Sequence, residues 1–336
     1  MKEYSMNKRI LLSGLICLLF AFRATAQLNA ASRELLAEKE DSLRILADSM
    51  INALSPADRF RADSSFVRGL VRALQVPHSI DYPFRSVATV SQLYPKDSSF
   101  RIFTWQLKKD EYVYHQKGAI QVRTTDGRLK LFPLFDASMF TTDPNDSVRS
   151  RNNWIGAIYY TIIQKEHNGK SYYTLLGFDD FSIASNKKWM EVLTFNANGE
   201  PVFGGPLISY AADSTGRKIK PRFSIEYKKE ANTVFNYNPE MDMIIFDHLI
   251  SETNEPDRKE TYIPDGDYEG FKWENGRWVH VDKVFNFSLQ DGQFPQESTI
   301  RDAEGNINEK ILEEASRRNM EKADSSKPAP KRKRDQ

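Results

Sequence analysis

The stretch that decides the fold is WIGAIYYTIIQKEHNGKSYYTLLGFD, residues Trp154–Asp179. It contains two runs rich in β-branched and aromatic residues, and Asn168-Gly169 separates them. Such runs are typical of β-strands, and an Asn-Gly pair supplies the positive φ angles that a tight hairpin requires. The first run is apolar on both alternations, so we expect a central strand that is covered on both faces. The stretch therefore predicts a hairpin inside a β-sheet.

The same pattern continues from about Ser86 to Phe285, in runs such as FRIFTWQL, GAIQVR, MEVLTF, RFSIEY, TVFNY and MDMIIF. In RFSIEY the apolar residues alternate with polar ones, which predicts a sheet with one solvent-exposed (wet) face. Pro133 predicts an edge strand or a bulge, because proline lacks a backbone N–H. The predicted strands do not alternate with helices, as they would in a βαβ fold. We therefore expect a mainly β fold, an antiparallel meander of roughly a dozen strands that closes as a barrel, packs as a sandwich or splits into propeller-like blades.

A helical segment is expected before the β domain, at residues 27–78. Its apolar positions recur at steps typical of a helix, and Ser55-Pro56 should break the pattern. A second, short helix is predicted over Asp63–Leu74. The segment is interpreted as a lid packed on the core, with a partner-binding coiled coil as the alternative. The apolar positions are Leu36, Leu43, Ala47, Met50 and Leu54.

A secretory signal peptide is predicted at the N-terminus, residues 1–26. Basic residues precede the apolar run Ile10–Phe22, and small residues follow at 24–26. The run is shorter than the ~20 residues that span a bilayer, so no transmembrane segment is expected after the signal is removed. We expect an exported, periplasmic protein that begins at Gln27.

The remaining boundaries follow from composition. The β domain is expected at 79–290, and a loop with a short helix at 291–323. Residues 324–336 end in KPAPKRKRDQ, which predicts a disordered basic tail. Peripheral contact of this tail with an anionic envelope surface is a possible partner interaction.

Composition excludes several function classes. The chain has 47 basic and 46 acidic residues, so its charge does not point to nucleic acid. Cys17 is the single cysteine and lies in the predicted signal, which leaves no disulfide, thiolate metal site or cysteine nucleophile afterwards. No Gly-x-Ser-x-Gly elbow occurs, and the glycines of GEPVFGGP precede no helix start. No cofactor is expected.

Strand ends carry the candidate catalytic residues. Asp179 and Asp180 end one strand and could pair with Glu191 as glycosidase-like carboxylates. Asp247 stands beside His248 after another strand, and such a pair can orient an imidazole or ligate zinc. The alternative is that these residues are ordinary hydrogen-bonded groups at strand ends.

A candidate metal site lies in IPDGDYEGFKWENGRW, residues Ile263–Trp278. Asp265, Asp267 and Glu269 alternate there like the first ligands of a calcium loop. The twelfth position of that loop should be a glutamate, and Gly276 occupies it instead. The pattern favours a turn at 264–266 followed by an aromatic hairpin. The expected cross-strand pairs are Trp273 with Trp278 and Phe271 with His280.

Several phrases, in their order along the chain, resemble a family of exported proteins from Bacteroidota-type bacteria. They are FRIFTW, WIGAIYYTII, YYTLLGFD, EVLTFNANGEPVFG, MDMIIFDHL and YIPDGDYEGFKWENGRWV. The resemblance covers roughly Ser99 to Val281 and implies export and a single β domain. The family has no established activity, so no catalytic residue is carried over.

The sequence therefore leaves two function classes open. The first is a non-catalytic envelope protein that binds a partner protein or a glycan, in keeping with its many aromatic residues and its predicted export. The second is a secreted hydrolase that uses the strand-end carboxylates. A cleft in which these side chains converge would favour the second.

Overall fold

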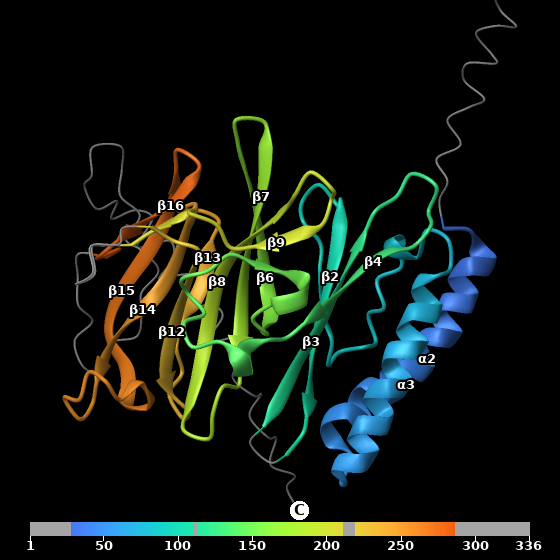
Figure 1. Ribbon diagram of the computed structural model, residues 1–336, viewed down its shortest axis with the longest axis horizontal. Helices are drawn as coiled ribbons and strands as arrows, with labels where there is room; N and C mark the ends of the chain where they lie inside the picture. The colour runs from blue at the N-terminus through green and yellow to red at the C-terminus, as the bar shows by residue number, and fades with distance from the viewer. Residues whose placement is uncertain (1–27, 111–112, 211–218, 286–336) are drawn as a thin grey trace, which may run out of the picture. The chain divides into compact units, whose positions relative to one another are not determined.

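The computed structural model describes residues 28–110, 113–210 and 219–285. They form two N-terminal helices followed by three β-sheets, and none of these sheets closes on itself within the described ranges (Figure 1). The chain divides into two units, Met1–Asn286 and Phe287–Gln336, and every described residue belongs to the first. The predicted signal peptide, C-terminal helix and basic tail lie outside the described residues.

The two helices are α2 (Ala30–Asn52) and α3 (Pro56–Leu74). The break between them lies where the sequence predicts it, because Ser55 caps α3 and its side chain accepts the N–H of Asp58. The second helix is longer than predicted. It begins at Pro56, since proline is suited to the first helical position, and not at Asp63.

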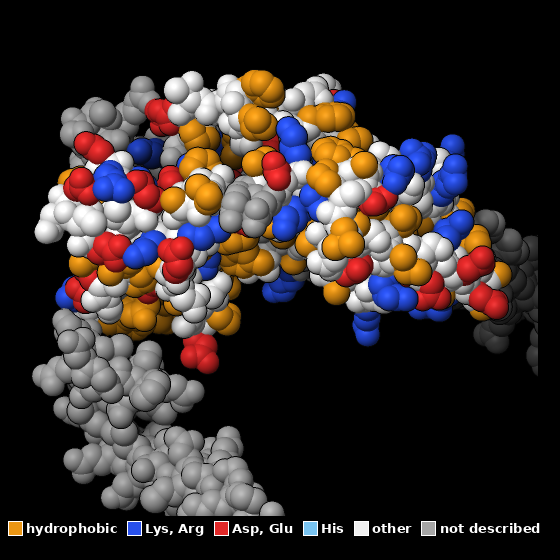
Figure 2. All heavy atoms as spheres, turned by 90° about the horizontal axis from the view of Figure 1, so that it is seen from below, with side chains coloured by type: hydrophobic (Ala, Val, Ile, Leu, Met, Phe, Trp, Pro, Cys, Tyr) orange, Lys and Arg blue, Asp and Glu red, His pale blue; other side chains and the backbone are white. Residues whose placement is uncertain are grey.

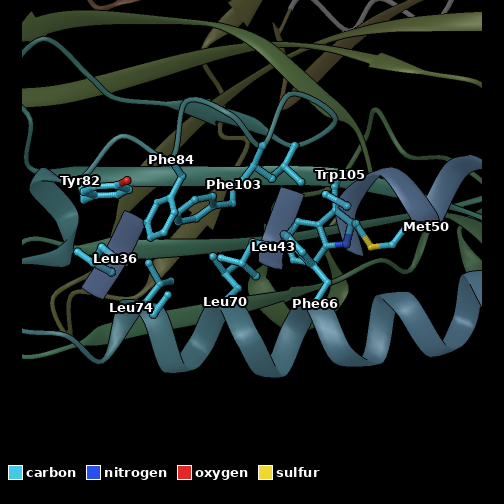
Figure 3. Packing of buried hydrophobic residues seen from close by; sticks show 14 of the residues in the cluster. Leu36, Leu43, Met50, Phe66, Leu70, Leu74, Tyr82, Phe84, Phe103 and Trp105 are labelled. Carbon is cyan, nitrogen blue, oxygen red and sulfur yellow. The ribbon is translucent and has the colours of Figure 1, made fainter. Parts of the chain in front are cut away.

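The helices cover the first sheet with one continuous apolar layer. Four of the five predicted apolar positions are buried, but Leu54 is 99% exposed because α2 has already ended at Asn52. Figure 3 shows these side chains meeting the aromatic residues of the sheet. The rings of Phe66 and Trp105 stand edge to face, 5.4 Å apart. The segment packs on the core of its own chain, as the lid interpretation predicts.

The first sheet has the strand order β1-β2-β3-β4. Its strands are β1 (Ser91–Leu93), β2 (Phe100–Lys108), β3 (Tyr114–Val122) and β4 (Lys130–Phe135). Pro133 lies in β4, which is an edge strand as predicted. Short 3-10 helices join the elements of the chain: η1 (Ser79–Asp81), η2 (Ser138–Phe140), η3 (Arg151–Asn153) and η4 (Lys259–Thr261).

The middle sheet has the order β5-β9-β8-β7-β6, and β12 pairs with β8 beside β9. Its strands are β5 (Arg149–Ser150), β6 (Ile158–His167), β7 (Lys170–Asp179), β8 (Ser185–Phe195), β9 (Pro201–Phe203) and β12 (Arg222–Lys228).

The strand expected at the centre of the sheet is β6, and that expectation is wrong in its position. β6 is an edge strand, while β7 and β8 lie inside the sheet. Both of its faces are nevertheless covered. A bulge between Tyr159 and Thr161 shifts the alternation, so that Tyr159 packs toward the first sheet and Ile163 toward the third.

The third sheet has the order β11-β10-β16-β15-β14-β13. Its strands are β10 (Ile208–Ser209), β11 (Ile219–Lys220), β13 (Phe235–Asn238), β14 (Met243–Ser251), β15 (Tyr262–Glu274) and β16 (Arg277–Val281). β10 and β16 are parallel, so the sheet is mixed and not wholly antiparallel as expected.

The hairpin of β15 and β16 has the predicted register. Trp273 pairs with Trp278 and Phe271 with His280, and both turn residues, Asn275 and Gly276, have positive φ angles. The predicted turn at 264–266 is wrong. Those residues belong to β15, where a bulge accommodates them.

The elements stack in the order helix pair, first sheet, middle sheet, third sheet (Figure 1). Strand β2 shows how one sheet serves two layers, because side chains alternate along a strand. Phe103 and Trp105 face the helices, whereas Phe100 and Ile102 face the middle sheet.

Candidate functional site

An apolar groove lies between α3 and the outer strands of the first sheet. Its volume is about 340 Å³, which falls in the range of small-molecule sites. Both helices pack on β2, and they leave the neighbouring face of β3 and β4 less covered. The apolar side chains that line the groove include Val67, Leu70, Val71, Ala119, Leu131 and Pro133.

The sheet register explains why these residues share one floor. Ala119 of β3 lies directly opposite Pro133 of β4, and Lys117 lies opposite Phe135. Residues opposite one another in a ladder project from the same face of the sheet. The floor is therefore apolar along its length and has a charged residue at one end.

Lys117 and His115 form this polar end. The ammonium of Lys117 pairs with Asp63 of α3, whose carboxylate is almost fully buried, while about a third of the Lys117 side chain remains exposed. The indole N–H of Trp105 donates to the other oxygen of Asp63, over 3.4 Å. His115 also lines the groove.

A second cation, Arg59, lies near this end but outside the lining of the groove. Arg59 lies one helical turn before Asp63, and its guanidinium donates to the backbone carbonyls of Ala53, Leu54 and Lys108. Among the described residues no carboxylate forms an ion pair with Arg59. Arg59 is not among the residues that line the groove, whereas Asp136 is, so an anion there would depend on the donors of Lys117 that Asp63 leaves free.

A second polar cluster lies on the opposite face of the first sheet, toward the middle sheet. The side-chain amide of Gln116 donates to Asp179 over 3.1 Å. Asp136 accepts the backbone N–H groups of Ser138 and Gly156. Gly156 is required here, because a Cβ atom at this position would collide with Gln116 and Asp136.

Asp179 forms no ion pair with another of the described residues. Burial raises its pKa to about 6, the hydrogen bond from Gln116 opposes that rise, and the negative charge of Asp136 adds to it. Oε1 of Gln116 is buried and finds no hydrogen-bond partner among the described residues. Asp180, the next residue, forms an ion pair with Lys229.

Glu191 has a different environment. It is 1% exposed, and Nε of Arg222 donates to it over 2.8 Å, while the hydroxyl of Tyr159 donates to its other oxygen. The expectation of one wet face for β12 is thus wrong at Arg222, which is fully buried to neutralise this carboxylate.

The structure does not bring the proposed glycosidase carboxylates together. Glu191 pairs with Leu175 of β7, four residues before Asp179, which corresponds to about 13 Å along the strand. Glycosidase pairs are separated by roughly 5–9.5 Å. Asp180 is engaged by Lys229 and is no closer substitute.

A third cluster lies where β14 and β15 bulge. His248 stands opposite three residues of β15, and this irregularity places its Nδ1 2.8 Å from Asp265. Its Nε2 lies 3.9 Å from Glu269, which is also 2.6 Å from Nε2 of His280. The hydroxyl of Tyr210 donates to the same carboxylate over 3.3 Å.

This cluster corrects one pairing inferred from the sequence. Asp247 does not orient His248, because its carboxylate accepts the backbone N–H of Val234 over 2.6 Å. Burial raises the pKa of Asp247. Asp267 pairs with Lys283 on the surface. Within the described ranges, no three His, Cys, Asp or Glu side chains are grouped so as to hold a metal ion.

Sequence reasoning missed the residues of the groove. His115 and Lys117 lie far along the chain from Asp63. Asp63 itself was predicted only as part of a helix, without a functional role. The one usable signal was Pro133, which marks β4 as the edge of the sheet and hence as a strand with a less covered face.

In comparisons with known proteins, no family model, no curated protein and no solved structure matches this chain. The resemblance to exported Bacteroidota-type proteins stays a prediction. None of the described helices combines the length and the apolar character needed to cross a membrane.

Proposed function

We propose that this chain is an exported, periplasmic envelope protein that binds an anionic amphiphile, a long-chain carboxylate, in the groove between α3 and β3–β4. The observation that carries the proposal is the groove itself, an apolar channel of about 340 Å³ with Lys117 at one end. The predicted signal peptide supports export.

The tail of such a ligand would lie on Ala119 and Pro133 and against the side of α3 that bears Val67 and Val71. Burial of methylene groups contributes about 0.8 kcal/mol each. The apolar lining suits an acyl chain better than the glycan considered from the sequence, because a sugar would lose its hydrogen bonds to water there.

The head group would meet Lys117 and His115. The ammonium of Lys117 has three donors, and Asp63 accepts one hydrogen bond from it. The others are available to a carboxylate oxygen, and the N–H of His115 can add a further hydrogen bond. A neutral alcohol would gain less from this end of the groove than a carboxylate.

Binding is favoured over the alternative, hydrolysis by strand-end carboxylates. Asp179 and Glu191 lie on the far side of the first sheet from the groove and about 13 Å apart. Neither position is that of an acid or nucleophile acting on a ligand held by Lys117.

Isothermal titration with dodecanoate and with 1-dodecanol tests the proposal. Dodecanoate should bind saturably with one site per chain. Val71→Trp should fill the groove and weaken binding at least about tenfold, the loss of roughly two buried methylene groups. Lys117→Gln, which keeps a donor for Asp63, should weaken dodecanoate and leave dodecanol unchanged.

The matched control is Ile45→Trp, which adds the same ring on the exposed side of α2. It should bind as the unmodified protein does. The proposal is wrong if neither ligand binds saturably, or if Val71→Trp and Ile45→Trp have the same effect.

A further inference from the structure

The groove between α3 and β3–β4 has two unlike ends. At one end Lys117 of β3 lies opposite Phe135 of β4. About a third of the Lys117 side chain and 54% of Phe135 are exposed, so solvent reaches this end, which is called the mouth below. The far end is marked by Leu131, which lies four residues before Phe135 and therefore on the same face of β4.

The mouth lies at the end of the molecule where α3 begins, because Asp63, in the first half of that helix, pairs with Lys117. This is the lower end of the ribbon in Figure 1, and Figure 2 views the molecule from that side. Hydrophobic side chains lie beside Lys and Arg side chains on the surface seen there. Both kinds of group are thus present at the end of the molecule from which a ligand would enter.

Apolar side chains fill the space beyond the far end. Leu74 lies one helical turn after Leu70 and is fully buried (Figure 3), and it belongs to the same apolar cluster as Val76. Leu129 and Leu131 pack against this cluster. Leu70 and Leu131 line the groove, whereas Leu74, Val76 and Leu129 do not. The hollow therefore ends at Leu70 and Leu131, while the apolar packing continues.

A buried polar network closes the floor of the groove at the same place. Gln121 of β3 lies opposite Leu131. Its side-chain oxygen accepts from Arg101 over 2.7 Å, and its amide donates to the hydroxyl of Ser79 over 3.0 Å. Arg101 also donates to the carbonyl of Ser79, over 3.1 Å. All three side chains are buried. A ligand tail that displaced them would leave buried polar groups unpaired, which is costly.

The strand geometry gives the length of the groove. The floor from Lys117 to Gln121 advances four residues along β3, which corresponds to about 13 Å. In an extended alkyl chain, a carbon–carbon bond of about 1.5 Å advances the chain by about 1.25 Å. A carboxylate held at Lys117 can therefore place about ten further carbons between the mouth and the far end.

We infer that the groove measures the length of its ligand and selects medium-chain carboxylates, with about eight to twelve carbons. This inference rests on the proposed function, because it concerns the same groove and the same head group. Methylene groups that lie between the mouth and Leu131 are buried and add affinity. Further methylene groups meet the closed end and must turn back to solvent, where they add none.

Isothermal titration with octanoate, decanoate, dodecanoate and tetradecanoate, each below its critical micelle concentration, tests this inference. The affinity should rise about tenfold for each two carbons from octanoate to dodecanoate, because each added methylene group is buried. Tetradecanoate should bind at most about twofold more tightly than dodecanoate, since its last carbons find no further apolar surface.

Two variants locate the limit in the groove. Leu131→Phe adds bulk at the far end and should weaken dodecanoate about tenfold more than octanoate, because only the longer tail reaches that end. Val67→Phe adds bulk one helical turn after Asp63, nearer the mouth, and should weaken both ligands by the same factor. The matched control is Ile45→Phe on the exposed side of α2, which should bind all four ligands as the unmodified protein does.

The inference is overturned if the affinity rises from dodecanoate to tetradecanoate by the same factor as in the earlier steps. It is also overturned if Leu131→Phe weakens octanoate as much as dodecanoate. In both cases carboxylates still bind in the groove, so the proposed function stands without the length limit. If none of the four carboxylates binds saturably, the proposed function and the length limit fail together.

Discussion

Asp179 and Glu191 are two buried carboxylates on the same face of the middle sheet, but they have different hydrogen-bond and ion-pair partners. Arg222 and Tyr159 surround Glu191, so its charge is neutralised where it is buried. Asp179 receives one amide hydrogen bond from Gln116 and forms no ion pair with the part of the chain that the structure describes, and burial raises its pKa to about 6. Burial alone therefore does not determine whether a carboxylate is neutralised by a cation; the residues placed beside it do.

The register of β8 with its neighbours explains the difference. Strand β12 places Arg222 opposite Glu191. Lys187 is opposite Asp179 in the same way, but its ammonium lies over the ring of Phe181 and pairs with Glu226. Asp179 therefore has a lysine as its cross-strand neighbour and still has no ion-pair partner within residues 28–110, 113–210 and 219–285.

The largest effect is expected when the neutralised carboxylate loses its partner. Arg222→Met should lower the free energy of unfolding by about 3–5 kcal/mol, because Glu191 would remain buried and unpaired. Urea denaturation measures the change.

The double variant Arg222→Met with Glu191→Leu is the control, and it should recover most of the lost stability. Equal losses in the single and double variants would mean that the ion pair contributes no specific coupling and that the contrast with Asp179 is unfounded.

A smaller, pH-dependent effect is expected at Asp179. Its pKa is about 6 when folded, above the ordinary value of 3.8, so the protonated form is the one that folding favours. The associated stability is complete below about pH 4 and is lost as the pH rises through 6, to a total of about 3 kcal/mol. Asp179→Asn cannot titrate and should lack this decline.

Denaturation of both proteins at pH 4.5 and pH 7.5 checks this expectation. As the pH rises, the free energy of unfolding of Asp179→Asn should increase relative to that of the unmodified protein. Parallel curves for the two would show that Asp179 does not titrate in this range and would contradict its raised pKa.

The smallest effect is expected at Asp180, whose ion pair with Lys229 is partly exposed. Asp180→Ala should reduce stability by less than about 1 kcal/mol, since exposed pairs are screened by solvent. The loss should shrink further in 0.5 M salt. A loss above about 2 kcal/mol in the same urea assay would place this pair with the buried Arg222–Glu191 pair.

Local chemistry was predictable from the sequence, and long-range pairing was not. The hairpin at Asn275-Gly276 has its register fixed by two residues that favour positive φ. The helix break at Ser55-Pro56 is equally local. By contrast, the neutralisation of Glu191 depends on β12 returning to the middle sheet, which places Arg222 beside a residue 31 positions away in the chain.

The candidate site was beyond sequence reasoning for a related reason. The groove exists because two helices cover only part of a four-stranded sheet. The periodicity of apolar residues in the sequence does not predict which part they cover. His248 was singled out for its neighbour Asp247, but a bulge gave it Asp265 as a partner. Bulges insert unpaired residues that a strict alternation does not anticipate.

The parallel pairing of β10 with β16 has a consequence for the order in which the chain can fold. Ile208 pairs with Trp278, so the strand that completes its hydrogen bonds emerges from the ribosome 70 residues later. Between these two strands the chain passes through β12, which belongs to the middle sheet. The chain therefore crosses from the third sheet to the middle sheet and back. Such non-local pairings slow folding, because loop-closure entropy must be overcome before contacts form. A chain interrupted before Trp278 would leave Ile208 with β11 as its neighbour but without β16, and so expose an apolar edge to aggregation.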